Sequence, residues 1–140
     1  MEGTVKVAEL FGVYSFPQVH HLISTIEGIL PPDKKFTDAF EACYPMGSMT
    51  GAPKKRVMEL IEETEEEERG LFSGSIGYIT SDGDFDLNVV IRSIFADTKA
   101  QKLCFSAGSG ITIGSNAEAE YDECLAKAEA IMKILSADRD

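Results

Sequence analysis

The clearest pattern along the chain is a helical stripe of apolar residues between positions 117 and 135. Apolar side chains recur there at the helical spacing of about 3.6 residues, at Tyr121, Cys124, Leu125, Ala128, Ile131, Met132 and Leu135. The spacing predicts a long amphipathic helix over 117–135. A second helix is predicted from Pro53, because Val57, Met58, Leu60 and Ile61 form another apolar face and proline suits the first helical position.

Other stretches have the β-branched content and alternation that are typical of strands. We expect strands at 5–14, 19–30, 71–80, 85–95 and 102–106, a short helix at 36–43 and a hairpin turn at Asp82-Gly83. A helical wheel also accepts 19–30, but its β-branched residues favour a strand. The pattern predicts an α+β fold, mainly an antiparallel sheet packed by helices, with the last three strands forming a meander.

The length, net charge and cysteine content of the chain exclude several classes of function. With 140 residues the chain has the length of one domain, and its formal net charge of −11 argues against binding to nucleic acid or to an anionic membrane. No apolar run reaches the ~20 residues that a membrane helix needs, so a cytoplasmic protein is expected. Three cysteines without CxxC spacing indicate reduced thiols rather than a disulfide framework or a zinc site.

The segment 44–54 combines turn formers, hydroxyls and a cation just before a predicted helix. Gly47 and Gly51 permit tight bends, and Ser48 and Thr50 supply hydroxyls. Free amides in the first turn of the following helix would attract an anion, which makes the segment a candidate binding loop. The alternative is a surface turn in which Ser48 or Thr50 only caps the helix.

Arg92 interrupts an otherwise apolar alternation between Val90 and Ile94. A charge at such a position is costly unless it is paired. Arg92 is therefore either a structural ion-pair partner or a ligand for an anion.

Three charged residues border the apolar stripe of the last predicted helix: Glu120, Glu123 and Lys127. Two carboxylates about 5.5 Å apart repel by roughly 3 kcal/mol at an effective dielectric of about 20, so in a partly dry site they require a cation. Lys127 supplies one charge, and Mg²⁺ would supply more. The alternative is an exposed helix edge with an ordinary Glu123–Lys127 pair.

Five blocks occur in one order along the chain. They are FPQVHHLIS at 16–24, PMGSMTGAPK at 45–54, Arg69-Gly70 with GSIGY at 74–78, IRS at 91–93, and AGSGI at 107–111 followed by Ser115, Glu120, Glu123 and Lys127. In this order they resemble the C-terminal part of the chorismate-utilising enzymes. Ser48 and the FPxVHH block make the para-aminobenzoate (aminodeoxychorismate) synthase component I branch the most similar, with anthranilate synthase component I as the alternative.

The resemblance implies a role for each matched residue. Glu123 would bind Mg²⁺ with support from Glu120, and the metal would hold the ring carboxylate of chorismate. The enolpyruvyl carboxylate would be bound by Tyr78, Arg92 and the amides of Gly108, Ser109 and Gly110, with Lys127 near the substrate. His21 and Ser48 would lie beside the ring carbon that loses its hydroxyl. The family reaction replaces this hydroxyl with an amino group, using ammonia from a glutamine amidotransferase partner, in folate biosynthesis.

The chain also departs from the family pattern. Family members are much longer, and their first half carries a second Glu-x-x-Glu pair of the Mg²⁺ site, a general base and a Pro-Ile-Lys-Gly-Thr lysine. That half has no counterpart among the five matched blocks. Residues 1–140 are thus expected to form one partial chorismate-binding domain, a fragment or half of a two-part enzyme that is inactive alone. The alternatives are anthranilate or isochorismate chemistry on the same scaffold, or a non-catalytic interaction module that self-associates through uncovered apolar surface.

Overall fold

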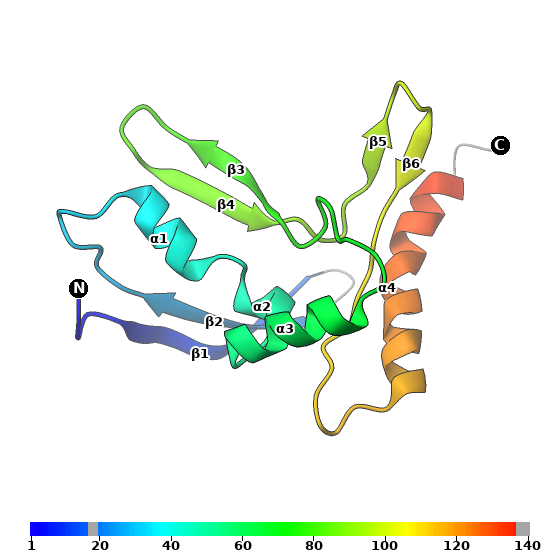
Figure 1. Cartoon of the computed structure of the whole chain (residues 1–140), viewed down its shortest axis with the longest axis horizontal. Coiled ribbons are helices and arrows are strands. Elements are labelled where there is room, and N and C mark those ends of the chain that lie inside the picture. The colour runs from blue at the N-terminus through cyan, green and yellow to red at the C-terminus, as the bar shows by residue number, and fades with distance from the viewer. Residues whose placement is uncertain (17–19, 137–140) are drawn as a thin grey trace. The chain divides into compact units, whose positions relative to one another are not determined.

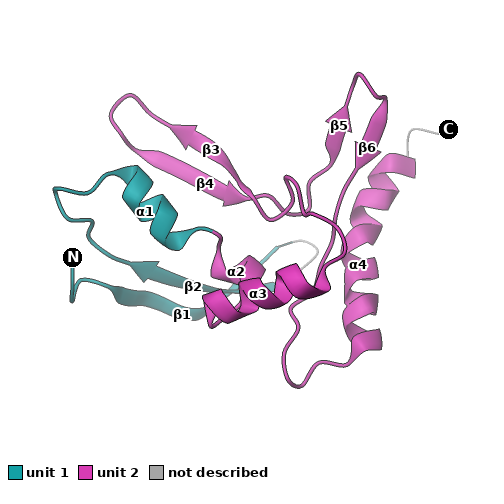
Figure 2. Ribbon diagram, in the orientation of Figure 1, with its two compact units in different colours: residues 1–44 teal, residues 45–140 magenta. Residues whose placement is uncertain are grey.

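A computed structural model describes residues 1–16 and 20–136 of the chain (Figure 1). The elements in order are β1 (Lys6–Ser15), β2 (His20–Glu27), α1 (Phe36–Cys43), α2 (Gly47–Thr50), α3 (Lys54–Thr64), β3 (Ser75–Ile79), β4 (Phe85–Val89), β5 (Phe95–Asp97), β6 (Lys102–Cys104) and α4 (Ala117–Ser136). The strands pair only antiparallel, and the α+β class is confirmed. The chain divides into two compact units, Met1–Tyr44 and Pro45–Asp140 (Figure 2).

Unit 1 is a β-hairpin followed by a short helix. Strands β1 and β2 pair antiparallel, with irregularities that flank Glu9. The strand expected at 19–30 is confirmed for His20–Glu27, whereas Pro17 and Val19 lie outside the described residues. Helix α1 matches its predicted bounds, and at its start the Lys35 amide donates to Asp38 Oδ2 at 2.7 Å.

In unit 2, β3 and β4 form the hairpin that Asp82-Gly83 predicted. The Thr80 amide donates to the Asp84 carbonyl at 2.8 Å, and Gly83 adopts φ = +91° in the turn. Gly77 is required in β3, because a Cβ at this position would lie 1.9 Å from the carbonyl oxygen of Asp86 on β4. The close approach expected from an interior glycine is thus an approach of the partner strand.

The expectation of one strand over 85–95 is wrong. Strand β4 ends at Val89, and Arg92 adopts the left-handed conformation (φ = +51°), which an L-residue rarely takes within a strand. Strand β5 then pairs with β6 alone, so the expected meander is instead two separate hairpins (Figure 1). The strand expected at 71–80 is also shorter, because residues 71–73 form a turn before β3 begins.

The structure assigns no turn or bend to the glycine-containing segment 107–110. Helix α3 begins one residue later than predicted, at Lys54, and stops at Thr64 before the acidic run. Helix α4 runs one residue beyond its predicted end. No described helix has the length and apolar character to cross a membrane.

Few side chains are buried in the described part of the chain. Only Ser73, Val90 and Ile131 fall in the buried class there, and all three belong to unit 2. Large apolar side chains of all three hairpins are exposed, among them Val7, Phe11, Val13, Leu22, Ile26, Ile76, Ile79 and Leu103. Apolar surface of this extent typically marks a contact face.

Candidate functional site

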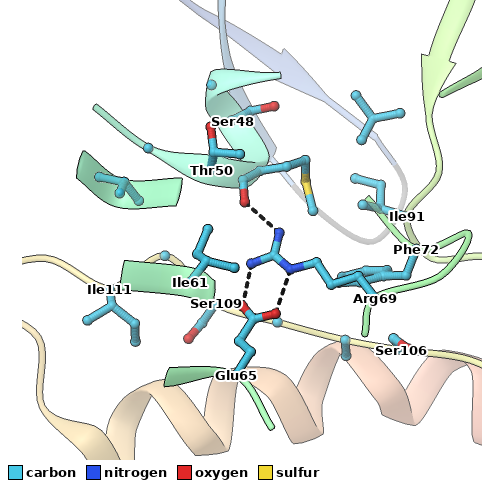
Figure 3. A pocket seen from close by; sticks show the side chains of 18 of the residues that line it. Ser48, Thr50, Ile61, Glu65, Arg69, Phe72, Ile91, Ser106, Ser109 and Ile111 are labelled. Carbon is cyan, nitrogen blue, oxygen red and sulfur yellow. Dashed lines mark hydrogen bonds and ion pairs between the residues drawn. The ribbon is translucent and has the colours of Figure 1, made fainter. Parts of the chain in front are cut away.

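An open cavity of about 1130 Å³ lies within unit 2. Its walls come from α2, the side of α3, residues 89–92, the segment 106–113, and α4 (Figure 3). The volume is slightly above the range of about 300–1,000 Å³ that is usual for a small-molecule site.

Residues 47–52 of the segment 44–54 line one wall of the cavity, and they are more ordered than the predicted loop. Residues Gly47–Thr50 make a single helical turn, α2. Gly51 follows with φ = +111°, and a Cβ there would contact Val57 at 3.3 Å, so only glycine fits easily. Ser48 and Thr50 both line the cavity (Figure 3).

The alternative role of Ser48 and Thr50 as caps of the next helix is excluded. The N-cap of α3 is Pro53, with no side-chain cap hydrogen bond, and the Thr50 hydroxyl donates instead to the Met46 carbonyl at 3.2 Å. The two hydroxyl residues therefore belong to the cavity wall rather than to the helix end.

Helix α3 contributes its side and not its N-terminus. Val57, Leu60, Ile61 and Thr64 line the cavity, whereas residues 53–56 do not. Three basic residues, Lys54, Lys55 and Arg56, fill the first turn, where the helix dipole disfavours positive charge. Contrary to the sequence prediction, the amides at the start of α3 therefore do not face the cavity. The positive charge at the cavity comes instead from cationic side chains on other elements.

Arg69 ties three segments of the cavity wall together (Figure 3). Its Nε and Nη2 atoms donate to the Glu65 carboxylate at 2.8 and 2.5 Å, and its Nη1 donates to the Met49 carbonyl at 2.9 Å and to Ser73 Oγ at 3.3 Å. The hydrogen bonds from Arg69 hold the pKa of the Glu65 carboxyl below its usual value, and those to Glu65 raise the pKa of Arg69.

Sequence reasoning missed both members of this pair. Glu65 is not among the predicted site residues, yet the structure places it in the cavity lining. The available signal was the i,i+4 spacing of Glu65 and Arg69, which is the spacing of helical ion pairs.

Helix α4 is tied to the segment 106–113 on the other side. Lys127 Nζ donates to the Gly108 carbonyl at 2.8 Å and pairs with Glu123 at 2.5 Å. Hydrogen bonds from Ser115 and then Ser109 lower the pKa of the half-buried Glu120, and the charge of Lys127 adds to this effect. The predicted neighbourhood of Glu120, Glu123 and Lys127 is therefore joined to the glycine segment.

Two carboxylates are available for a metal at this helix. Glu120 and Glu123 supply hard oxygen donors, which Mg²⁺ accepts together with water and substrate oxygens. The described residues contain no group of three or more His, Cys, Asp or Glu side chains that could hold a metal ion. Glu120 and Glu123 are not among the cavity-lining residues, and a Mg²⁺ ion held by them would need its remaining ligands from water or substrate.

Six of the predicted site residues line the same cavity: Ser48, Arg92, Gly108, Ser109, Gly110 and Lys127. Tyr78 lies on β3, 62% exposed, and is not among the lining residues. His21 belongs to unit 1, where its ring meets that of Phe16 edge-on with centroids 5.7 Å apart. Arg92 is exposed in the break after β4, which corrects its expected position on a strand covered on both faces.

The charge of the cavity differs from that of the chain. Among the described lining residues Arg69, Arg92 and Lys127 are cationic and Glu65 alone is acidic, although the chain carries a formal net charge of −11. The left-handed Arg92 adds backbone strain, which concentrates at functional sites. Cations beside hydroxyl groups in a partly apolar cavity suit a small anionic ligand.

Comparison with known proteins identifies the family of the chain. The chorismate binding enzyme family matches residues 1–133. Aminodeoxychorismate synthase component 1 of Salmonella typhimurium is 49% identical over 133 residues, and that of Escherichia coli is 47% identical; each alignment covers 95% of this chain and 29% of the relative. Anthranilate synthase component 1 of Thermus thermophilus is 44% identical, over 95% of this chain and 28% of its own.

A solved structure gives the same result for the fold. Anthranilate synthase component I from Streptococcus pneumoniae matches with a TM-score of 0.80 and 38% identity, covering 90% of this chain and 28% of that one. The chain therefore spans less than a third of the length of these relatives. On the family match, the sequence identity and the shared structure, the chain belongs to the chorismate binding enzyme family.

Proposed function

We propose that this chain forms part of an aminodeoxychorismate synthase component I, which replaces the 4-hydroxyl of chorismate with ammonia. The observation that carries the proposal is the meeting of Ser48, Arg92, Lys127 and the segment Gly108 to Gly110 at one cation-bearing cavity. Similarity supports the branch, because relatives with that name reach 47–49% identity.

Within the cavity, each group has a chemical task that its structure permits. Arg92 offers a planar, permanently charged fork for a carboxylate, and the Ser109 and Gly110 amides add neutral donors. Lys127 contributes a second positive charge near the Gly108 carbonyl. The Ser48 hydroxyl would donate a hydrogen bond to the departing hydroxyl. His21 belongs to unit 1 and not to this cavity, and its role as the proton donor is proposed from the family resemblance alone.

Glu120 and Glu123 are the residues that would hold Mg²⁺. The ion would neutralise the ring carboxylate of chorismate in an otherwise acidic chain. Glu123 is paired with Lys127 at 2.5 Å, so holding the ion and keeping this pair would be alternative roles for the Glu123 carboxylate.

The test is an activity assay with chorismate, Mg²⁺ and an ammonium salt, after the remaining part of a family domain has been added as a separate polypeptide. We expect 4-amino-4-deoxychorismate from the reconstituted sample and none from the chain alone. An Arg92→Ala variant should lose the product, while the surface variant Lys133→Met should keep it. Absence of product from the reconstituted wild-type sample contradicts the proposal.

Anthranilate chemistry is the second candidate, favoured by relatives with that name at 44% identity and 38% identity in the solved structure. The same assay separates the two, since anthranilate is fluorescent and 4-amino-4-deoxychorismate is not an aromatic amine. Ammonia is proposed to come from a glutamine amidotransferase partner, so glutamine should replace the ammonium salt only when such a subunit is added.

The exposed apolar hairpins support a further part of the proposal, that the isolated chain is inactive and self-associates. Side chains such as Phe11 and Leu22, 66% and 70% exposed, favour contact with other apolar surface. Size-exclusion chromatography with light scattering should give a mass well above 15.3 kDa. A clean monomer at that mass contradicts self-association but leaves the chorismate proposal standing.

A further inference from the structure

Helix α2 carries Ser48 and Thr50 into the cavity, but it consists of only four residues. A helix this short is not stable on its own, because nucleation fixes several dihedral angles before hydrogen bonds offset that cost. Its last-turn carbonyls, including that of Met49, also lack donors within the helix. The orientation of α2 must therefore depend on contacts with other segments.

Arg69 provides such a contact from 20 residues away. Its Nη1 donates to the Met49 carbonyl at 2.9 Å, which satisfies one of these last-turn acceptors. The rest of the guanidinium is held by two hydrogen bonds to Glu65, just beyond the end of α3, so the donor is fixed in direction. Figure 3 shows the guanidinium of Arg69 between Glu65 and the α2 wall.

We propose that Arg69 is a positioning residue, which holds α2 and hence Ser48 and Thr50 at the cavity wall through its bond to the Met49 carbonyl. The importance of this position of Ser48 and Thr50 for catalysis rests on the proposed function, whereas the hold of Arg69 on α2 does not depend on it. Arg69 acts through geometry as well as charge, since it contacts Glu65, Met49 and Ser73 at once.

Two other roles for Arg69 would leave different signatures. A direct ligand for an anionic substrate would matter for binding but not for the order of α2 in the free protein. A general stabilising ion pair would change every part of unit 2 to a similar extent. A single ammonium group could replace Arg69 in both of those roles, but it cannot reproduce a fork that reaches three partners.

Backbone amide exchange measured by NMR in the full 140-residue chain separates the three roles. The informative amides are those of Thr50 and Gly51, which donate to the carbonyls of Met46 and Gly47 at 3.1 and 2.8 Å. Amides of α4 report on the rest of unit 2. Arg56→Met is the matched control, because Arg56 forms surface ion pairs with Glu59 and Glu63 on α3 and does not line the cavity.

In Arg69→Met we expect Thr50 and Gly51 to exchange about tenfold faster relative to the α4 amides, because the hydrogen bond to the Met49 carbonyl is lost. Arg69→Lys should behave almost as Arg69→Met, and Arg56→Met as wild type. If Arg69→Met unfolds the chain, the α4 amides also exchange fast. The test is then made with Arg69→Lys, in which Thr50 and Gly51 should exchange faster than in the wild type while the α4 amides do not.

Wild-type exchange at Thr50 and Gly51 in Arg69→Lys overturns the proposal, since charge alone would then suffice. Unchanged exchange in Arg69→Met overturns it too, and combined with lost chorismate binding it would make Arg69 a direct ligand. A wild-type chain that fails to bind chorismate in the reconstituted sample argues against the proposed function. That result leaves the exchange pattern, and with it the positioning role, intact.

Discussion

Each of the two walls of the cavity contains an ion pair at i,i+4 spacing, but the two pairs have different surroundings. On one wall Glu65 pairs with Arg69, and on the other Glu123 pairs with Lys127, each at i,i+4 and 2.5 Å. In both cases the cation also donates to a backbone carbonyl about 20 residues earlier in the chain, at Met49 or at Gly108.

The difference lies in the cation and its surroundings. Arg69 holds four hydrogen bonds in a rigid plane, and its side chain is 26% exposed. Lys127, 32% exposed, is a point charge on a flexible stem, and its partner Glu123 is 52% exposed, against 38% for Glu65. The Arg69 pair is therefore suited to holding backbone in place, whereas the Glu123–Lys127 pair is easier to break.

The largest expected difference between the two walls is in the contribution of each ion pair to stability. It is tested by neutralising the carboxylates of Glu65 and Glu123 in separate variants. Glu65→Gln should lower the free energy of unfolding by about 1–2 kcal/mol, because it leaves a partly buried guanidinium without its counter-charge. Glu123→Gln should cost no more than about 0.5 kcal/mol, as is usual for exposed pairs. Urea unfolding measures both, and equal losses would show that the two walls do not differ.

A second test addresses ligand binding. Lys127→Met should weaken chorismate binding about tenfold in the reconstituted domain, because it removes one charge-assisted contact. Lys133→Met is the matched control, since Lys133 also pairs at i,i+4 on α4 but does not line the cavity. Isothermal titration calorimetry gives both affinities, and the same affinity in both variants would remove Lys127 from the site.

The pH dependence of stability gives a third, smaller effect. Because Arg69 depresses the folded-state pKa of Glu65 below the ordinary 4.5, this carboxylate contributes stability above pH 4.5. That contribution is lost as the pH falls through the folded-state value. Between pH 6 and the acid limit of folding, wild type should therefore lose more stability than Glu65→Gln. Parallel losses in urea unfolding would contradict the pairing.

The smallest expected effect concerns Glu120 on α4. Ser115→Ala and Ser109→Ala should each raise the pKa of Glu120 toward 4.5, with Ser115→Ala having the larger effect because its hydrogen bond is the main cause of the depression. NMR titration of the Glu120 side-chain carboxyl carbon measures both shifts. A pKa that neither substitution changes would mean that the segment 109–115 does not contact α4 in solution.

The sequence predicted the features that depend on interactions between nearby residues more accurately than those that depend on residues far apart in the chain. Helices α1 and α4 and the β3–β4 turn were predicted almost to the residue, because periodicity and turn chemistry act within a few residues. The break at Arg92 escaped prediction, since its apolar neighbours alternate as they would in a strand. Only the left-handed backbone there shows that the sheet stops.

The candidate site shows the same division. The amino-acid sequence by itself determined the helical spacing of Glu120, Glu123 and Lys127 and the glycine and hydroxyl content of 44–54. The tertiary structure decided that Ser48, Arg92 and the glycine segment share one cavity, that Tyr78 is not among its lining residues, and that Arg69 reaches Met49. The physical reason is that side-chain spacing within a helix is local, whereas a cavity needs chain segments about 20 to 80 residues apart to meet, which no local pattern encodes.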